Sequence, residues 1–174
     1  MVLKRRIYEK YISGVTNFPI TSTSYADGGV IPLRFACVVP DGGTNVSPQY
    51  NWSDVPGGTT YLAIVMDDEV APCGTGTGAC KHWALYNIPV ATTSVAEDLD
   101  ISTIAGTTEG ENYDGLNDYA GPCPPDTHTY KTTIYATDTM VLIPPGEAHN
   151  RASFEAAYKA DIIGKATYTG TYTP

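Results

Sequence analysis

The sequence has no long apolar run and few basic residues, and each absence excludes a class of protein. No apolar stretch approaches the roughly 18–20 residues that span a membrane. Lysine and arginine number 10 against 19 acidic residues, which gives a net charge of −9. No basic stripe interrupts this balance, so we expect no binding to nucleic acid or to anionic membranes. The basic N-terminal segment, residues 1–12, lacks a following apolar stretch, so we expect no signal peptide in the sequence as it stands.

Long runs of Leu, Glu and Lys are also absent, which disfavours a helical protein. The chain instead contains 17 Gly, 13 Pro and 13 Tyr, with frequent Thr, and this composition favours strands and turns. Its 174 residues suffice for one domain with a real core and are few for two. Because no repeat or linker divides the chain, we predict a single domain over residues 1–174.

Short apolar runs alternate with turn-forming residues along the chain. The nearly continuous run "TYLAIVMDD" (60–68) predicts a strand that is buried on both faces. Strands separated by Gly- and Pro-rich loops predict a mainly all-β fold, an antiparallel β-sandwich or barrel. The other predicted strands are 30–38, 81–89, 130–138 and 165–174, with an extended stretch inside 40–52.

One helix is predicted near the C-terminus. Ser153 is placed to cap "FEAAYKADII", in which Phe154, Tyr158 and Ile162 recur every four residues on one face, and Gly164 would end it. These signals predict a helix over about residues 154–163.

Two further stretches complete the outline of the fold. A short helical turn is expected in "SVAEDLD" (94–100). Residues 101–118 are rich in Gly, Asn, Asp and Glu and read as a long surface loop. A loop of this length in a compact domain is more often functional or mobile than accidental.

The four cysteines form an even set of Cys37, Cys73, Cys80 and Cys123. Cys73 and Cys80 bracket "GTGTGA", which has no side chains suited to packing, so we predict a disulfide between them. That bond implies a periplasmic or extracellular location or a thermophilic host, whereas free thiols favour the cytoplasm. A pair of free thiols and a zinc site completed by His82 remain open alternatives, although no fourth zinc ligand lies nearby. The pattern leaves the redox state of Cys37 and Cys123 open.

Only three histidines are present, so their positions are informative. His149 sits in a polar loop before the predicted helix and is expected at the surface. His82 and His128 open predicted strands and Asp68 closes the central one, each beside a Gly- and Pro-rich loop of the kind that carries binding residues. His128 and Tyr130 are two apart and share one face of their strand. Asp68 can fix the tautomer of one imidazole and leave other ring nitrogens to donate to an anion.

The same groups permit other chemistry, which the sequence leaves open. Two histidines and one aspartate also suit a metal ion. Cys123, within "DYAGPCPPDTHTY" (118–130), is the nearby nucleophile for a hydrolase, but neither a helix nor a G-x-S-x-G-like elbow accompanies it. Taken singly, each histidine would be a structural residue at a strand end. We expect no metal, no cofactor and no catalytic residue.

Four stretches occur in an order that resembles a known family. They are "NVSPQYNWSDVPGGTTYLAIVMDDEVAP" (45–72), "HWALYNIP" (82–89), "YAGPCPPDTHTYKTTIYATD" (119–138) and "IIGKATYTGTY" (162–172). Together they resemble the phosphatidylethanolamine-binding protein (PEBP) family, in its bacterial and archaeal Raf-kinase-inhibitor-like branch, over about residues 30–172.

The resemblance implies a single PEBP-like domain, a sandwich of two antiparallel sheets with a small anion pocket at one end. Residues 1–20 would then form an N-terminal extension, and one C-terminal helix and short helical turns would complete the fold. By matching motifs, the resemblance implies that the ligand-binding residues are Asp68, His82, Gly121, Cys123 through its backbone, His128 and Tyr130.

The sequence departs from the family pattern at two places. The family motif D-P-D-A-P is here Asp68-Glu69-Val70-Ala71-Pro72, so a proline and a second aspartate are replaced. The cysteine-bracketed loop of residues 73–80 is an addition to the pattern, and a disulfide there would stiffen the segment between Asp68 and His82. The replaced aspartate puts the affinity and specificity for the ligand in question.

From the residues and the resemblance together we expect a non-enzymatic binding protein for phosphate or a phosphorylated head group. The resemblance also implies a kinase or protease as protein partner and a homodimer. The alternatives are a hydrolase acting on small phosphoryl or acyl esters, and a protein-interaction inhibitor with a vestigial pocket. If the histidines must gain protons to hold an anion, its affinity should rise as the pH falls through about 6.5.

Overall fold

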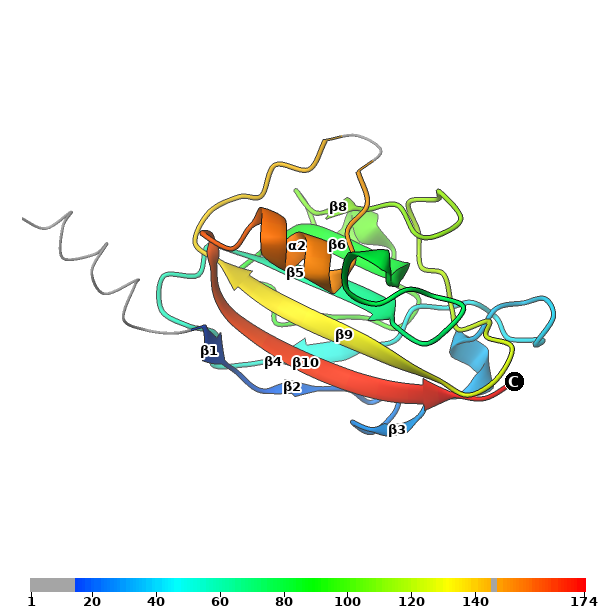
Figure 1. The fold of residues 1–174 in the computed structure, drawn as a ribbon. Coiled ribbons are helices and arrows are strands. Elements are labelled where there is room, and N and C mark those ends of the chain that lie inside the picture. Colours follow the sequence, from blue (N-terminus) through cyan, green and yellow to red (C-terminus); the bar gives the residue numbers. More distant parts are fainter. Residues whose placement is uncertain (1–14, 145–146) are drawn as a thin grey trace, which may run out of the picture.

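Two β-sheets and one helix make up the fold (Figure 1), seen in a computed structural model that describes residues 15–144 and 147–174. The larger sheet has the strand order β1-β10-β9-β5-β6-β8, with β3 also pairing with β10, and the smaller has the order β2-β4-β7. Among the described strands, β1 and β3 run parallel to β10, whereas the other pairs are antiparallel. The mainly β, sandwich-type prediction is confirmed, with two short parallel pairs that it did not include.

The elements have the following bounds. The larger sheet contains β1 (Thr16–Asn17), β3 (Gly29–Val30), β5 (Tyr61–Asp68), β6 (Cys80–Pro89), β8 (Thr108–Glu109), β9 (His128–Thr137) and β10 (Ile162–Tyr172). The smaller sheet contains β2 (Ile20–Thr21), β4 (Tyr50–Trp52) and β7 (Ser94–Val95). The helix α2 spans Arg151–Ala157, and three 3-10 turns are η1 (Leu33–Phe35), η2 (Gly76–Gly78) and η3 (Ile101–Thr103).

Strand β5 is buried on both faces, as its apolar run predicts. Because side chains alternate along a strand, Met66 and Val65 point into different layers. Met66 belongs to the main core together with Trp52 of β4 in the smaller sheet. Val65 belongs to a second cluster with Phe154 of α2, which covers the other face. Each such side chain, fully removed from water, contributes about 1.5–3 kcal/mol.

Helix α2 begins earlier and ends earlier than the sequence predicts. Asn150 is the N-cap: its Oδ1 accepts from the Ser153 backbone N–H at 2.9 Å, and its own N–H donates to the Ser153 hydroxyl at 3.0 Å. Ser153 is therefore the third residue of the helix and not its cap, because this reciprocal pair satisfies two free N–H groups at once. Tyr158 closes the helix, and Ile162 and Gly164 lie in β10, whose pairing with β9 prevents the helix from continuing.

Two other local predictions are wrong. Residues 30–38 form the end of β3 followed by η1, because the consecutive residues Phe35 and Ala36 both lie in the main core, whereas a strand would point them to opposite faces. Residues 94–100 begin with β7, which pairs with β4, and contain no helical turn. The 3-10 turn lies just beyond, where the Asp100 carboxylate accepts from the Ser102 N–H at 2.9 Å.

His149 is buried and not at the surface, contrary to the prediction. Its side chain is packed beneath α2, with ring centroids 5.9 Å from Phe154 and 5.6 Å from Tyr158. Its Nε2 lies 3.0 Å from a Glu147 carboxylate oxygen. Burial lowers the pKa of His149, and the nearby Glu147 charge opposes this effect. The apolar face of α2 covers a residue that its polar neighbours in the sequence led us to place in water.

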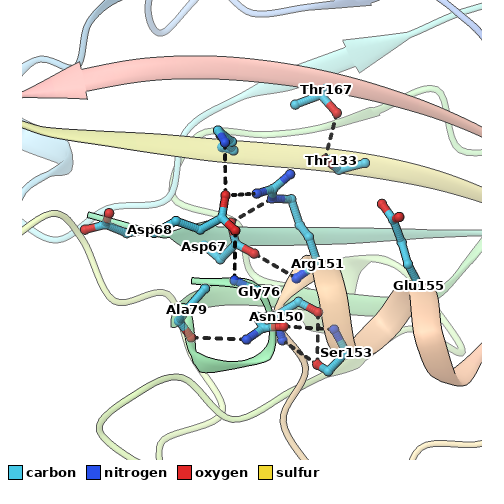
Figure 2. Close-up of polar contacts among 12 residues, drawn as sticks. Asp67, Asp68, Gly76, Ala79, Thr133, Asn150, Arg151, Ser153, Glu155 and Thr167 are labelled. Carbon is cyan, nitrogen blue, oxygen red and sulfur yellow. Dashed lines mark hydrogen bonds and ion pairs between the residues drawn. The ribbon is translucent and has the colours of Figure 1, made fainter. Parts of the chain in front are cut away.

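An ion-pair network ties α2 to the end of β5 (Figure 2). The Arg151 Nε donates to Oδ1 of the buried Asp67 at 2.7 Å, and the Arg151 backbone N–H donates to Oδ2 at 2.8 Å. Burial raises the pKa of Asp67, while these bonds from Arg151 lower it. Figure 2 shows Asp68 pointing away from Arg151. The network therefore fixes the strand end from one side and leaves Asp68 available on the other.

Candidate functional site

Three strand ends meet at one end of the larger sheet. In the register of the sheet, Asp68 at the end of β5 lies opposite Cys80 at the start of β6 and opposite Tyr130 near the start of β9. His82, near the start of β6, and His128, at the start of β9, therefore lie where β5 finishes. Asp68, His82, His128 and Tyr130 are all buried, each no more than 4% exposed. The prediction that residues at these strand edges come together agrees with this geometry.

Asp68 and His128 form a buried pair. The His128 Nδ1 donates a short hydrogen bond to the Asp68 Oδ2. The other oxygen, Oδ1, accepts from the Val70 backbone N–H at 2.7 Å. Val70 thus supports the carboxylate through its main chain, which any residue other than proline supplies. This contact explains how the loop still holds Asp68 although the aspartate of the family pattern is replaced here.

Glu69, which replaces the family proline, ties the cysteine loop to the sheet. Its Oε1 accepts from the Gly76 N–H at 3.1 Å, and its Oε2 accepts from the Lys131 and Arg151 side chains, each at 3.0 Å. These hydrogen bonds and charges lower the pKa of Glu69. The added loop is therefore anchored to β9 and α2 as well as closed by its own disulfide.

His82 is held by the proline-rich loop. Its Nδ1 lies 2.7 Å from the Ala120 carbonyl oxygen, which only accepts, so Nδ1 carries the proton. Burial lowers the pKa of His82, while the Ala120 carbonyl and the Asp68 charge raise it. Its ring centroid lies 4.9 Å from that of Tyr130 and 5.1 Å from that of Tyr113, edge to face. The ring is thus fixed in place with Nε2 as the nitrogen left for a ligand.

Tyr130 stands between the two histidines. Its ring centroid is 6.4 Å from that of His128, nearly parallel, and at right angles to His82. Burial and the Asp68 charge raise its pKa, so the phenol keeps its proton at any physiological pH. A neutral hydroxyl can donate to an anion without adding charge to the site.

Gly121 and Cys123 belong to the proline-rich loop next to His82, and each has one group that is already bonded. The Gly121 N–H donates to the Asn45 Oδ1 at 2.7 Å, so this donor is already in use. A Cβ at Gly121 would lie 2.2 Å from the Phe35 carbonyl oxygen, which explains the glycine. Cys123 forms a disulfide with Cys37, so its sulfur is no nucleophile, and a ligand contact through its backbone stays a prediction.

Both disulfides involve residues that the sequence singled out or left open. The Cys73–Cys80 bond is present as predicted, and it removes both sulfurs from the alternative zinc site. The Cys37–Cys123 bond joins residues 86 apart in the chain. Within the described residues, one group of metal-ligand types lies close together, Cys37, Asp41 and Cys123, and two of its members are in that bond. Nothing in this grouping offers thiolates to a metal.

The unused atoms of the cluster are the two Nε2 nitrogens. The His128 Nε2 is buried and has no hydrogen-bond partner among the described residues, with an Asp126 carboxylate oxygen 3.3 Å away. Since both Nδ1 atoms bear protons that acceptors engage, each neutral ring presents a lone pair at Nε2 and becomes a donor there only when protonated. The site can thus receive either a proton donor or, once charged, an anion.

Two cavities lie around Tyr119 in the neighbouring loop, and the linings of both lack Asp68, His82, His128 and Tyr130. One of about 160 Å³ is lined by Val38, Tyr113, Leu116 and Ala120 among others, and it reaches the residues that contact His82. Another of about 240 Å³ is bordered by Trp83 and Glu109. Both cavities share Asn45, Asp118 and Tyr119.

Tyr113, Ala120, Asn45 and Cys37 therefore belong to the surroundings of the site although sequence reasoning did not select them. Cys37 had a signal, because pairing Cys73 with Cys80 leaves Cys37 and Cys123 as the remaining cysteines. Asn45 opens a stretch that resembles the family. The loop conformation brings the Tyr113 ring against His82, and this conformation cannot be read from the sequence. Ala120 acts through its backbone carbonyl, which every residue has.

The sheet arrangement is that of a phosphatidylethanolamine-binding-protein fold, and the buried Asp-His-Tyr cluster is its candidate site. The sequence model of the phosphatidylethanolamine-binding protein family matches residues 21–173. The chain belongs to this family, which confirms the resemblance seen in its motifs. The match starts at residue 21, before the predicted start near residue 30 and directly after the predicted extension of residues 1–20. The strands β1 and β2 pair with the sheets within residues 16–21.

Relatives of the chain come from bacteria and archaea. The UPF0098 protein of Aquifex aeolicus is 31% identical over 170 residues, which cover 95% of this chain and 94% of that protein. The UPF0098 protein of Methanothermobacter thermautotrophicus is 34% identical over 152 residues, covering 86% and 94%. A Mycobacterium tuberculosis protein named as a lipoprotein, LppC, is 36% identical over 156 residues, covering 88% and 71%.

Solved structures of the family share the fold. Escherichia coli YbcL matches with a TM-score of 0.78 and 28% identity, covering 90% of this chain and 98% of that one. The Chlamydia trachomatis homologue CT736 matches with a TM-score of 0.75 and 28% identity, covering 91% and 99%. None of the helices in the described residues is long and apolar enough to cross a membrane. The predicted absence of a signal peptide concerns residues 1–12, which lie outside the described residues.

Proposed function

We propose that the protein binds a small oxyanion, phosphate or a phosphorylated head group, at the Nε2 atoms of His82 and His128. The observation that carries the proposal is the buried His128 Nε2 without a hydrogen-bond partner. An unsatisfied buried polar group costs about 1–3 kcal/mol, which a ligand bonded to it would recover. Tyr130 supplies a neutral hydroxyl beside both rings. Membership of the family supports a ligand-binding role.

The tautomers determine how such an anion is held. Because both Nδ1 protons are engaged by Asp68 and Ala120, a fully deprotonated anion requires a proton on each Nε2. A ligand that carries its own hydroxyl, such as a monoprotonated phosphate, can instead donate to one ring and accept from the other. Burial holds the His82 pKa below its ordinary value, so affinity should keep rising as the pH falls below about 6.5. The Asp126 carboxylate beside the His128 Nε2 would compete with the anion.

Calorimetric titration with inorganic phosphate at about pH 7.5 and 5.5 tests the proposal. We expect tighter binding at the lower pH, and at least a roughly tenfold weaker affinity in His128→Gln, which removes a charged hydrogen bond worth about 1.5–3 kcal/mol. His149→Gln is the matched control, since His149 is equally buried but lies beneath α2. Equal affinity at both pH values, or wild-type affinity in His128→Gln, would contradict the proposal.

A second candidate function is hydrolysis of a small phosphoryl or acyl ester. The Asp68–His128 pair favours it, because a carboxylate that accepts from Nδ1 leaves Nε2 as a base able to activate water. The expected result under our first proposal is no turnover of p-nitrophenyl phosphate or p-nitrophenyl acetate. Turnover that disappears in both His82→Gln and His128→Gln would make the protein an enzyme.

We further infer a location outside the cytoplasm. Disulfides persist in oxidising compartments, and both pairs of cysteines are bonded here. Similarity to the lipoprotein-named LppC supports the same location. Alkylation of thiols in freshly lysed source cells should leave all four cysteines unmodified, and labelled cysteines would contradict this inference.

Two predictions from the family resemblance remain. One is regulation of a kinase or protease partner, with or without a ligand in the pocket, and the other is assembly into a homodimer. Partner binding that persists when both histidines are replaced would favour an inhibitor with a vestigial pocket. Light scattering of the purified chain measures the mass: a value near 37 kDa, twice the 18.6 kDa of one chain, would support a dimer.

A further inference from the structure

Asn45 bridges two backbone groups of the loop that holds His82. Its Oδ1 accepts from the Gly121 N–H at 2.7 Å, and its Nδ2 donates to the Tyr119 carbonyl at 3.0 Å. A backbone N–H can only donate and a carbonyl can only accept, so these two partners leave one orientation for the amide. The side chain therefore clamps the residues on either side of Ala120.

Ala120 is the residue that fixes His82. Its carbonyl accepts from the His82 Nδ1 at 2.7 Å, and its N–H donates to the His82 backbone carbonyl at 2.8 Å. The Ala120 carbonyl determines which ring nitrogen of His82 bears the proton, because it accepts a hydrogen bond from Nδ1 and so stabilises the tautomer that is protonated there. Whatever holds residues 119–121 in place thus acts on the chemistry of the His82 ring.

The backbone of Asn45 is itself fixed for this task. Its φ is 55°, in the left-handed region that asparagine tolerates better than most side chains. Its N–H donates to the Ala36 carbonyl at 2.9 Å. The residue needs both this backbone conformation and an amide with one donor and one acceptor, and asparagine combines the two.

We propose that Asn45 is a positioning residue that sets the tautomer of His82 by clamping the backbone on both sides of Ala120. The clamp keeps the Ala120 carbonyl against Nδ1 and thereby keeps Nε2 as the ligand atom. Other bonds also hold this loop: the Cys37 N–H donates to the Pro122 carbonyl at 2.9 Å, and the Tyr119 hydroxyl donates to the Phe35 carbonyl at 3.0 Å. Loss of the Asn45 side chain therefore removes the two bonds that flank Ala120 and loosens the position of its carbonyl, while the loop stays attached.

The tautomer is measured directly by the 15N shifts of the imidazole nitrogens, at about pH 8 where an ordinary histidine is neutral. We expect the Nδ1–H form of His82 in the wild type and a mixture of both forms in Asn45→Gly, which keeps the left-handed backbone. Asn45→Asp keeps the acceptor for Gly121 but removes the donor to Tyr119, so it should give an intermediate mixture. If Asn45→Gly does not fold, the tautomer of His82 is measured in Asn45→Asp instead.

Asn117→Gly is the matched control, since it removes an exposed loop amide that donates to the Glu109 carbonyl. Its His82 shifts should equal those of the wild type, and the His149 shifts should stay constant in every variant. An unchanged His82 tautomer in the Asn45 variants would overturn the proposal, whatever happens to their stability.

The effect on ligand binding rests on the proposed function, whereas the effect on the tautomer does not. If His82 binds phosphate through Nε2, Asn45→Gly should weaken phosphate binding about tenfold, as loss of a supporting hydrogen bond does at metal sites. A changed tautomer together with no phosphate binding by the wild type would support the positioning role and refute the proposed function. Weakened phosphate binding with an unchanged tautomer would overturn the positioning role.

Discussion

Replacement of Asp68 by asparagine separates the two roles of its carboxylate. The Oδ1 accepts from the Val70 N–H at 2.7 Å, and the Oδ2 accepts from the His128 Nδ1. In Asp68→Asn the Val70 N–H still requires an acceptor, so the amide oxygen must stay on that side. The amide nitrogen then faces Nδ1 and donates to it. His128 therefore changes tautomer, and its neutral ring carries the proton on Nε2.

The magnitudes follow from the loss of one buried charge-assisted hydrogen bond. Such a bond contributes about 1.5–3 kcal/mol against roughly 0.5–1.5 kcal/mol for a neutral one, so the exchange should cost about 1–2 kcal/mol. At about 2–4 °C per kcal/mol for a chain of this size, Tm should fall by roughly 2–8 °C. Binding should change in a different way: the neutral His128 ring becomes a donor at Nε2, so phosphate affinity should lose the part of its pH dependence that comes from this ring and keep the part that comes from His82.

Thermal unfolding and phosphate calorimetry between about pH 5.5 and 7.5 measure both effects. Asp54→Asn is the control, because it removes the same charge from an exposed turn. It should keep the wild-type affinity and its rise at low pH. An Asp68→Asn protein whose affinity rises at low pH as steeply as that of the wild type would refute the assignment of Nε2 as the ligand atom.

Three further predictions concern stability. Burial holds the His82 pKa below its value in the unfolded chain, so the unfolded chain binds more protons at low pH. The free energy of unfolding should therefore be highest above about pH 6.5 and fall as the pH decreases. Urea unfolding at about pH 7.5 and 5 measures this change. Replacing both cysteines of the Cys37–Cys123 disulfide by serine should lower the free energy of unfolding by about 4.5 kcal/mol, against about 2.5 kcal/mol for Cys73–Cys80, because the Cys37–Cys123 bond closes the longer loop. Equal losses in denaturant unfolding would contradict this entropic origin. Arg151→Ala leaves Asp67 buried and unpaired and should cost about 3–5 kcal/mol in the same assay, and a loss below about 1 kcal/mol would show that the network contributes little.

Sequence reasoning located the central strands and the site because their signals are local. The run ending at Asp68 reports burial on both faces, and His82 and His128 stand at strand starts beside proline-rich loops. Their convergence needed only the expectation that neighbouring strand ends meet. The hydrogen-bond partners of the histidines could not be predicted in this way, since Ala120 acts through a backbone carbonyl that every residue possesses.

The errors have physical causes that lie beyond local patterns. Ser153 and Asn150 can both cap a helix, and the reciprocal hydrogen bonds that choose Asn150 depend on three-dimensional geometry. His149 has polar neighbours in the sequence, yet the rings of α2 cover it. The Cys37–Cys123 disulfide, which the sequence left open, joins residues 86 apart, a contact set by the fold.

A crystal structure of the wild-type protein soaked with phosphate at about pH 5.5, where histidines begin to gain protons, tests the site most directly. We predict density for one phosphate with oxygens about 2.7–2.9 Å from the Nε2 atoms of His82 and His128, the length of charged hydrogen bonds. The Gly121 N–H should remain bonded to Asn45. A phosphate bound only elsewhere, or no density beside these nitrogens at a concentration that saturates the calorimetric titration, would contradict the proposed site.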